Sequence, residues 1–214
     1  REMFGDTHDI LYVSVDNERK FEPTYCVDVR EWDGAAALAA DYPDVERWDI
    51  VWASPPCTEY SLAKSRGQRN FLLADSIVWA CVELIRDLRP RYWYMENPAT
   101  GHLHRRAFMA DLVPYRHTVH YCRYGAPYKK PTHIWTNADF SPLLCSSGTP
   151  CEAIEGGRHP ATSQRGTHKA PRSDGSRATP SKRDEAYVVP TPLLRDLFAG
   201  CASVSLPPSV ASAE

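Results

Sequence analysis

The chain has 214 residues, of which 43% are hydrophobic and 24% charged, and its net charge is −2. These values are typical of a globular protein and suffice for one full α/β domain. No apolar run approaches the roughly 18 residues of a membrane span, and no signal-peptide pattern is present. Seven cysteines without a CxxC motif favour a reducing compartment over a disulfide framework. We therefore expect a cytoplasmic protein that is not secreted.

Strands and helices alternate along the first two thirds of the chain. Apolar runs predict strands at 11–15, 25–29, 48–53, 92–95, 118–121 and 133–135. Helical patterns occur at 35–40, 71–88 and 105–112. The run 48–53, WDIVWA, is nearly continuously apolar, as in a strand buried on both faces. The alternation predicts an α/β fold with a mostly parallel sheet and helices on both faces.

Composition changes near residue 138. All six tryptophans lie at or before Trp135, whereas nine of the eighteen prolines lie from Pro142 onward. This division predicts a core, a small irregular insert and a C-terminal segment, at 1–137, 138–185 and 186–214. Residues 156–183 carry seven basic side chains and one acidic one. Such a segment is a candidate phosphate contact, although charge alone favours a solvated loop.

Four chemically distinctive residues lie at or just after the carboxyl ends of predicted strands, where ligands bind in such sheets. They are Asp16, Asp28, Cys57 and Glu96. A strand–helix–strand crossover between Cys57 and Glu96 predicts that the thiol and the carboxylate share one crevice. The alternatives are a turn-capping role for Asp16, a small buried apolar role for Cys57 and a surface position for Glu96.

Three segments, in this order, resemble the cytosine carbon-5 DNA methyltransferases, and above all the small phage and virus branch of that family. They are DIVWASPPCTEYS at 49–61, YMENP at 94–98 and YCRYGAPYKKPTHIWTN at 121–137. The segment YVVPTPLLRDLF at 187–198 is similar to the closing motif of the family, whose helix returns to the cofactor pocket. The resemblance implies a Rossmann-like methyltransferase fold and an enzyme that uses S-adenosylmethionine as its cofactor.

The resemblance also implies roles for catalytic residues. Cys57 is the expected nucleophile, Glu96 the acid that grips the target base, and Lys130 a positive charge near the thiolate. The chemistry agrees, because carbon 5 of cytosine becomes nucleophilic only after a thiolate adds to carbon 6. That step requires a thiol with a lowered pKa and a carboxyl group against the ring nitrogen and amine.

Binding residues follow from the same resemblance. VSVDNE at 13–18 and CVDV at 26–29 fit the segments that hold S-adenosylmethionine. The expected cofactor-binding residues are Asp16, Asn17, Asp28, Val29 and Pro55. The expected DNA-binding residues are Ser61, Lys64, Arg66 and Arg69 beside the nucleophile, and Arg172 and Arg177 in the insert. A base must leave its stack to reach the crevice, and phosphate contacts compensate that cost.

Two departures from the family pattern stand out. The family opens with Phe-x-Gly-x-Gly, whereas this chain opens with REMFGD, which we interpret as the result of an N-terminal truncation. The family's Gln-x-Arg-x-Arg is replaced by Tyr128, Lys130 and Thr132, which leaves one basic side chain where two arginines are usual.

The insert also contains Cys145, Cys151, His159 and His168. Their spacing is not that of a standard zinc finger, so we predict no metal site, with a structural zinc as the open alternative.

The sequence thus predicts a monomeric DNA cytosine-5 methyltransferase, located in the cytoplasm near the nucleoid or in the host cell of a virus. An RNA or nucleotide cytosine methyltransferase is one alternative. A catalytically inactive DNA-binding remnant is the other.

Overall fold

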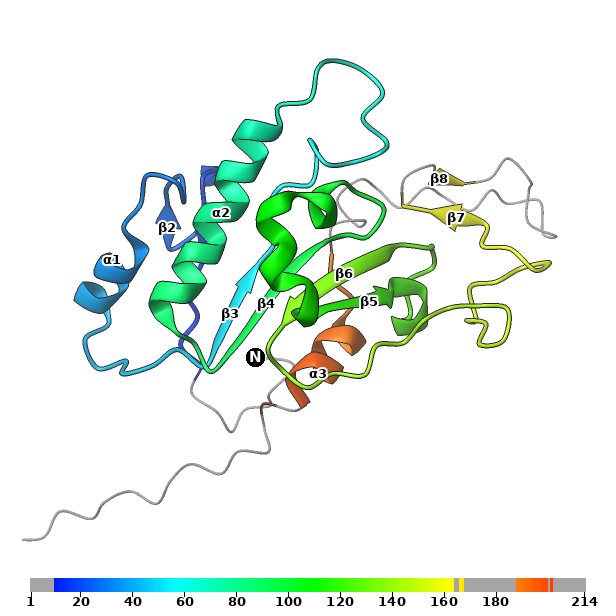
Figure 1. Cartoon of the computed structure of the whole chain (residues 1–214). Coiled ribbons are helices and arrows are strands. Elements are labelled where there is room, and N and C mark those ends of the chain that lie inside the picture. The colour runs from blue at the N-terminus through cyan, green and yellow to red at the C-terminus, as the bar shows by residue number, and fades with distance from the viewer. Residues whose placement is uncertain (1–9, 164–165, 168–187, 200, 202–214) are drawn as a thin grey trace, which may run out of the picture.

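The computed structural model describes residues 10–163, 166–167, 188–199 and 201 (Figure 1). The α-helices are α1 (Gly34–Asp41), α2 (Phe71–Leu88) and α3 (Thr191–Ala199). The 3-10 helices are η1 (Arg19–Phe21), η2 (Leu103–Arg105), η3 (Ala107–Tyr115) and η4 (Tyr121–Tyr124). The strands are β1 (Val15–Asp16), β2 (Tyr25–Cys26), β3 (Ile50–Ala53), β4 (Tyr92–Pro98), β5 (Arg116–His120), β6 (Pro131–Thr136), β7 (Ala161–Thr162) and β8 (Gly166–Thr167). Within these residues, no helix is both long and apolar enough to cross a membrane.

The main sheet has the strand order β3-β4-β6-β5. β3 and β4 are parallel, with Ala53 opposite Met95, because the α2 crossover returns the chain in the same direction. β6 is antiparallel to both of its neighbours. The expected mostly parallel arrangement is therefore wrong for this sheet. β5 and β6 are joined by a short turn around η4, and a connection without a crossover helix reverses the chain. Two small sheets, β1-β2 (parallel) and β7-β8 (antiparallel), complete the described part.

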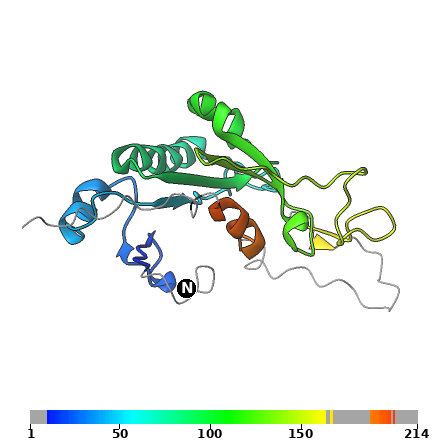
Figure 2. The ribbon, with the colours of Figure 1, turned by 90° about the horizontal axis from the view of Figure 1, so that it is seen from below.

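Helices cover both faces of the main sheet, as expected (Figure 2). Successive side chains of a strand point to opposite faces. On β4, Tyr94 packs in one buried cluster with Leu193 and Leu197 of α3, and its hydroxyl donates to the Leu197 carbonyl at 2.9 Å. Met95 belongs to the cluster on the other face, with Val78 of α2. The centre of the sheet is thus buried on both sides.

Helix α2 has the bounds that its apolar pattern predicts. The Asn70 side chain accepts the Leu73 N–H at 3.0 Å and caps the first turn. Arg89 ends the helix in the left-handed region, immediately before Pro90. The buried positions recur with helical spacing, at Ala74, Val78, Val82 and Ile85. This helix connects β3 to β4 as parallel neighbours, so the loops that follow the two strands lie at the same end of the sheet.

Four predicted elements differ from those observed. The strands expected at 11–15 and 25–29 are each reduced to two residues, in β1 and β2. All residues of β3 are only half-buried, because β3 is the edge of the four-stranded sheet. The helix expected at 105–112 is the 3-10 helix η3.

Candidate active site

The loop after β3 carries Cys57 in a tight turn. The Cys57 carbonyl accepts the N–H groups of Tyr60 at 3.0 Å and Ser61 at 2.9 Å. Tyr60 is fully buried, and its hydroxyl donates to the Asp75 carboxylate of α2 at 2.8 Å. Asp75 also forms an ion pair with Arg106 at 2.5 Å. These contacts anchor the turn to α2 and thereby fix the backbone position of Cys57.

The loops after β3 and β4 are joined directly. The Asn97 amide, 1% exposed, donates to the Pro55 carbonyl at 3.0 Å. The His102 N–H donates to the Tyr60 carbonyl at 2.9 Å. A Cβ at Gly101 would lie 3.4 Å from that same carbonyl oxygen, so the backbones approach closely where glycine stands. These hydrogen bonds therefore fix the positions of the two loops relative to one another.

Glu96 lies buried near the end of β4. It is 8% exposed and Lys130 is 6% exposed. The Lys130 Nζ lies 3.4 Å from Glu96 Oε1, and the Tyr121 hydroxyl donates to the same oxygen at 3.2 Å. Lys130 also lies over the Tyr121 ring, 4.5 Å from its centroid. Burial and the charge of Glu96 raise the pKa of Tyr121, which keeps this hydroxyl a donor. The carboxylate is thus held by one cation and one hydroxyl.

The Cys57 thiol lies within the electrostatic field of this pair. Burial raises the pKa of Cys57 above its ordinary value, the charge of Glu96 raises it further, and the charge of Lys130 lowers it. The net direction is the reverse of what the chemistry requires. In the free protein Cys57 is therefore protonated at neutral pH, because its burial and the carboxylate outweigh the lysine.

The predicted cofactor-binding acids lie at the ends of the parallel strands β1 and β2. Asp16 Oδ1 accepts the Glu18 N–H at 2.7 Å, which closes a turn. Asp28 forms an ion pair with Arg30 at 2.5 Å. Hydrogen bonds from Arg30 lower the pKa of Asp28. Register pairs Asp16 with Cys26, so the two carboxylates stand on neighbouring strand ends.

The other three predicted cofactor residues lie in three different places. Asn17 is exposed beside Asp16, whereas Pro55 is buried after β3. Val29 lines an open groove of about 740 Å³ between the 29–34 segment and α2, together with Trp32 and Trp79. The volume of this groove is within the range of small-molecule sites.

The basic side chains beside Cys57 are largely engaged within their own loop. Lys64 Nζ lies 2.6 Å from the Glu59 carboxylate. Arg69 donates to the carbonyls of Glu59 at 2.7 Å and Ser61 at 2.8 Å. Arg66 is exposed. The two predicted residues of the insert lie outside the described residues: Arg172 and Arg177. DNA contact by this set stays a prediction.

Two participants are missing from the sequence-based set, Glu59 and Tyr121. Asn97 adjoins Glu96 in the YMENP motif, whose resemblance to the family implies that the Glu-Asn pair binds the target base. Glu59 lies between Cys57 and the basic residues, and its opposite charge is the signal that could have identified it. Tyr121 gave no signal, since its contact with Glu96 depends on the turn that brings η4 beside β4.

Comparisons with known proteins identify the family of the chain. A family model of C-5 cytosine-specific DNA methylases matches residues 13–107. A protein of Frog virus 3 (isolate Goorha), named as a probable DNA (cytosine-5)-methyltransferase, is 30% identical over 222 residues, covering 94% of this chain and 98% of the viral protein. A solved structure, titled as a DNA modification methyltransferase of an E. coli prophage, is 14% identical, with a TM-score of 0.41, and covers 69% of this chain and 42% of its own. On the viral relative and the matched motifs, the chain belongs to the family of C-5 cytosine-specific DNA methylases.

Proposed function

We propose that this protein transfers a methyl group from S-adenosylmethionine to carbon 5 of cytosine in DNA, with Cys57 as the nucleophile. One observation carries the proposal. The Cys57 thiol lies within the field of the buried Glu96–Lys130 pair, at the ends of two adjacent parallel strands. A member of this family needs a thiol and a carboxyl group on one base, and these two strand ends supply both.

The residues act in sequence on the cytosine ring. The Cys57 thiol releases its proton to solvent, and the thiolate forms a bond to carbon 6, while the Glu96 carboxyl group holds the ring nitrogen and the exocyclic amine. When bound, S-adenosylmethionine supplies an electrophilic methyl group for carbon 5. The proton of carbon 5 then leaves to a solvent water molecule, and the bond between Cys57 sulfur and carbon 6 breaks. The thiolate is regenerated, so atoms and charge balance over one turnover.

The raised pKa of Cys57 has a place in this scheme. Glu96 raises that pKa through its negative charge, and Lys130 opposes it. A cytosine that carries a proton on its ring nitrogen beside Glu96 offsets the carboxylate charge, which weakens the first influence and leaves the second. Substrate entry then favours the thiolate. The nucleophile is thereby activated only when a cytosine is in place.

Asn97 supports a ligand at the same strand end. Its Oδ1 is buried and has no hydrogen-bond partner among the described residues, while its Nδ2 is occupied by Pro55. A buried acceptor without a donor costs about 1–3 kcal/mol. A substrate amine would satisfy it.

The carboxylates beside β1 and β2 fit a nucleoside cofactor, such as a Rossmann-like methyltransferase fold would bind. Carboxylates after parallel strands bind ribose hydroxyls in such folds, and Asp16 has that position. Asp28 would have to release Arg30 before binding an adenine amine, because the guanidinium contacts both carboxylate oxygens. We assign ribose binding to Asp16 and adenine contacts to Asp28 and Val29, with Asn17 and Pro55 at the border of the site.

DNA binding is assigned to two regions. Arg66 and Ser61 lie in the loop after Cys57, and Lys64 and Arg69 join them if that loop opens. The segment 138–185 is the proposed target-recognition region, between the core (1–137) and the C-terminal segment (186–214).

Mass spectrometry of nucleosides tests the proposed function. Purified protein is incubated with S-adenosylmethionine carrying a deuterated methyl group and with either DNA or RNA, and the digested nucleosides are analysed. We expect labelled 5-methyldeoxycytidine, its loss in Cys57→Ala, and its retention in the control Cys81→Ala on α2. Label in RNA alone would replace the DNA substrate with an RNA substrate. Label on the exocyclic amine would overturn the carbon-5 chemistry.

A further inference from the structure

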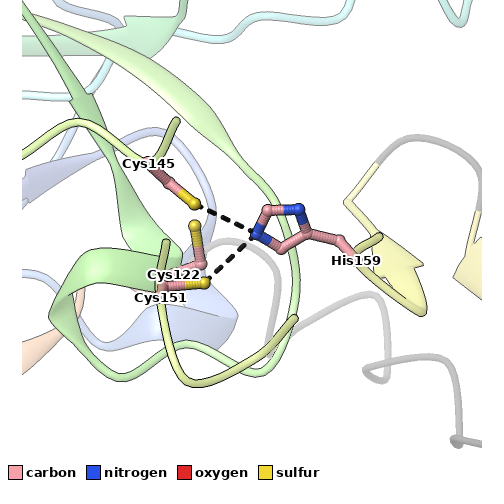
Figure 3. Close-up of side chains that lie close together, drawn as sticks. All are labelled: Cys122, Cys145, Cys151 and His159. Atoms are coloured by element: carbon pink, nitrogen blue, oxygen red, sulfur yellow. Dashed lines mark hydrogen bonds between the residues drawn. The ribbon is translucent and has the colours of Figure 1, made fainter. Parts of the chain in front are cut away.

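Three cysteines and one histidine converge far from the Cys57 loop in sequence. Cys122, Cys145, Cys151 and His159 each offer one ligand atom, and these four atoms all lie within 4.8 Å of one another (Figure 3). Among the described residues, this is the one group of three or more His, Cys, Asp or Glu side chains whose ligand atoms lie close enough together to hold a metal ion. The close-up shows the three sulfurs gathered around one ring nitrogen of His159.

The distances match a tetrahedral zinc centre. His159 Nε2 lies 3.6 Å from Cys145 Sγ and 3.2 Å from Cys151 Sγ. With zinc bonds of about 2.3 Å to sulfur and about 2.0 Å to nitrogen, a tetrahedron has sulfur–nitrogen edges of roughly 3.5 Å. Three thiols and an imidazole form one of the ligand sets typical of structural zinc. Only small shifts are needed to accept the ion.

The backbone holds two of the ligands from the sheet side. Cys122 lies on η4, immediately after β5. The Cys145 N–H donates to His120 Nδ1 at 3.0 Å, so the last residue of β5 fixes the second ligand. Both thiols are buried.

The other two ligands are held by turns of the insert. Arg123 donates to the Pro150 carbonyl at 2.7 Å, which places Cys151 next to η4. Glu155 and Arg158 exchange backbone hydrogen bonds of 2.8 and 3.0 Å around Gly156 and Gly157, whose φ angles are 55° and 79°. This tight glycine hairpin brings His159 back onto the three sulfurs.

Apolar packing closes the cluster. Ala153 and Ile154 pack against the three cysteines. Four protein ligands complete a tetrahedral shell, which is the mark of a structural rather than a catalytic zinc ion.

We propose that Cys122, Cys145, Cys151 and His159 form a structural zinc site that fastens the insert to the catalytic core. It replaces the prediction of no metal, and it differs from the open alternative in that Cys122 is a ligand. His168 lies outside the described residues. The site ties residues 145–159 to η4, whose first residue, Tyr121, contacts Glu96. It stands independently of the methyl-transfer proposal.

Metal analysis of the full chain tests the site. Protein purified with added zinc should hold one zinc ion per chain after gel filtration, and zinc binding should release protons from the thiols. Replacement with Co²⁺ should give the intense visible bands of a tetrahedral cobalt–thiolate centre. His159→Cys should keep a tetrahedral site, with cobalt bands shifted toward those of four thiolates.

Variants distinguish this site from the other cysteines. Cys145→Ser and Cys151→Ser should each weaken zinc binding by at least about tenfold, whereas Cys26→Ser and Cys81→Ser should leave it unchanged. Circular dichroism checks that each variant is folded. Octahedral cobalt spectra, equal affinity in Cys145→Ser, or a disulfide among these cysteines in freshly reduced, zinc-supplied protein would overturn the proposal.

Discussion

At the scale of single residues, the buried Glu96 couples two properties of the site. The carboxylate is held by Lys130 and Tyr121, and its charge raises the pKa of the neighbouring Cys57 thiol. The same group that grips the base therefore suppresses the nucleophile until the base arrives. This coupling predicts that one substitution changes thiol reactivity and turnover in opposite directions.

Glu96→Gln tests that coupling. Removing the negative charge lowers the pKa of Cys57. At a pH below the pKa, each unit by which the pKa falls raises the thiolate fraction about tenfold. We expect faster alkylation of Cys57 by iodoacetamide near neutral pH. We also expect turnover to fall by about a hundredfold or more, because the acid that serves the base is lost.

Peptide mass spectrometry across a pH series measures the alkylation site by site. Cys122 serves as the internal control, since unfolding would expose it together with Cys57. Slower or unchanged alkylation of Cys57 in a folded Glu96→Gln protein would contradict the coupling, and unchanged turnover would remove Glu96 from the mechanism.

At the scale of elements, the loop between Cys57 and α2 is closed by its own charges. Glu59 binds Lys64 and also accepts the Asn70 N–H at 2.7 Å. Lys64 and Arg69 are thereby neutralised or occupied within the loop, and Arg66 is exposed. If DNA engages this loop, the ion pair between Glu59 and Lys64 must compete with phosphate.

Glu59→Gln makes that competition measurable. Glutamine retains an acceptor for the Asn70 N–H but frees the charge of Lys64. We expect tighter DNA binding and a steeper dependence of log affinity on log salt, by at most about 0.9 for one added phosphate contact. Arg66→Gln should change the slope in the opposite direction.

Fluorescence anisotropy with a labelled duplex over a range of salt concentrations gives both slopes. The matched control is Glu83→Gln, which breaks an exposed ion pair with Arg86 on α2. If Glu59→Gln and Glu83→Gln have the same slope, Lys64 does not contact phosphate.

The elements also show what the sequence determines locally. The bounds of α2 could be predicted because its apolar spacing, the Asn70 cap and Pro90 act within a few residues. The antiparallel insertion of β6 between β4 and β5 could not, since strand order depends on contacts between distant segments. Glu96 was predicted just after a strand, yet β4 continues through Pro98, because pairing with β6 extends it.

At the scale of the whole molecule, histidines with lowered pKa values link stability to pH. Burial, with the charges of His104 and Arg116, lowers the pKa of His133 from 6.5 to about 4. Burial also lowers the pKa of His104 and His120. Because the unfolded chain takes up these protons first, the free energy of unfolding should fall as the pH decreases from about 6.5 toward 4.

His133→Gln tests this linkage. The folded protein excludes the proton of His133 until about pH 4, so stability is fully present above pH 6.5 and is lost as the pH falls through that window. Removing the group should flatten the decline by on the order of 2 kcal/mol between pH 7 and pH 4. Urea denaturation at several pH values measures it, and parallel curves for the two proteins would exclude His133 as a contributor.

The candidate site was predictable in part for the same reason as the fold. The crossover through α2 predicted that Cys57 and Glu96 share one edge of the sheet, and the structure has them there. The predicted absence of a metal site depended on spacing within the insert alone. Cys122 lies 23 positions before Cys145 in the sequence, so only the turn at η4 shows that it faces the same point.

The central claim is that Cys57 attacks carbon 6 of a cytosine in DNA. The most direct test uses DNA in which fluorine replaces the hydrogen on carbon 5, because fluorine cannot leave as a cation after methyl transfer. A preparation active in methyl transfer should stay attached to this DNA on a denaturing gel, in a manner that requires S-adenosylmethionine. Peptide mass spectrometry should locate the bond at Cys57, and Cys57→Ser should abolish it. An active preparation that forms no adduct, or forms it at another cysteine, would contradict the account.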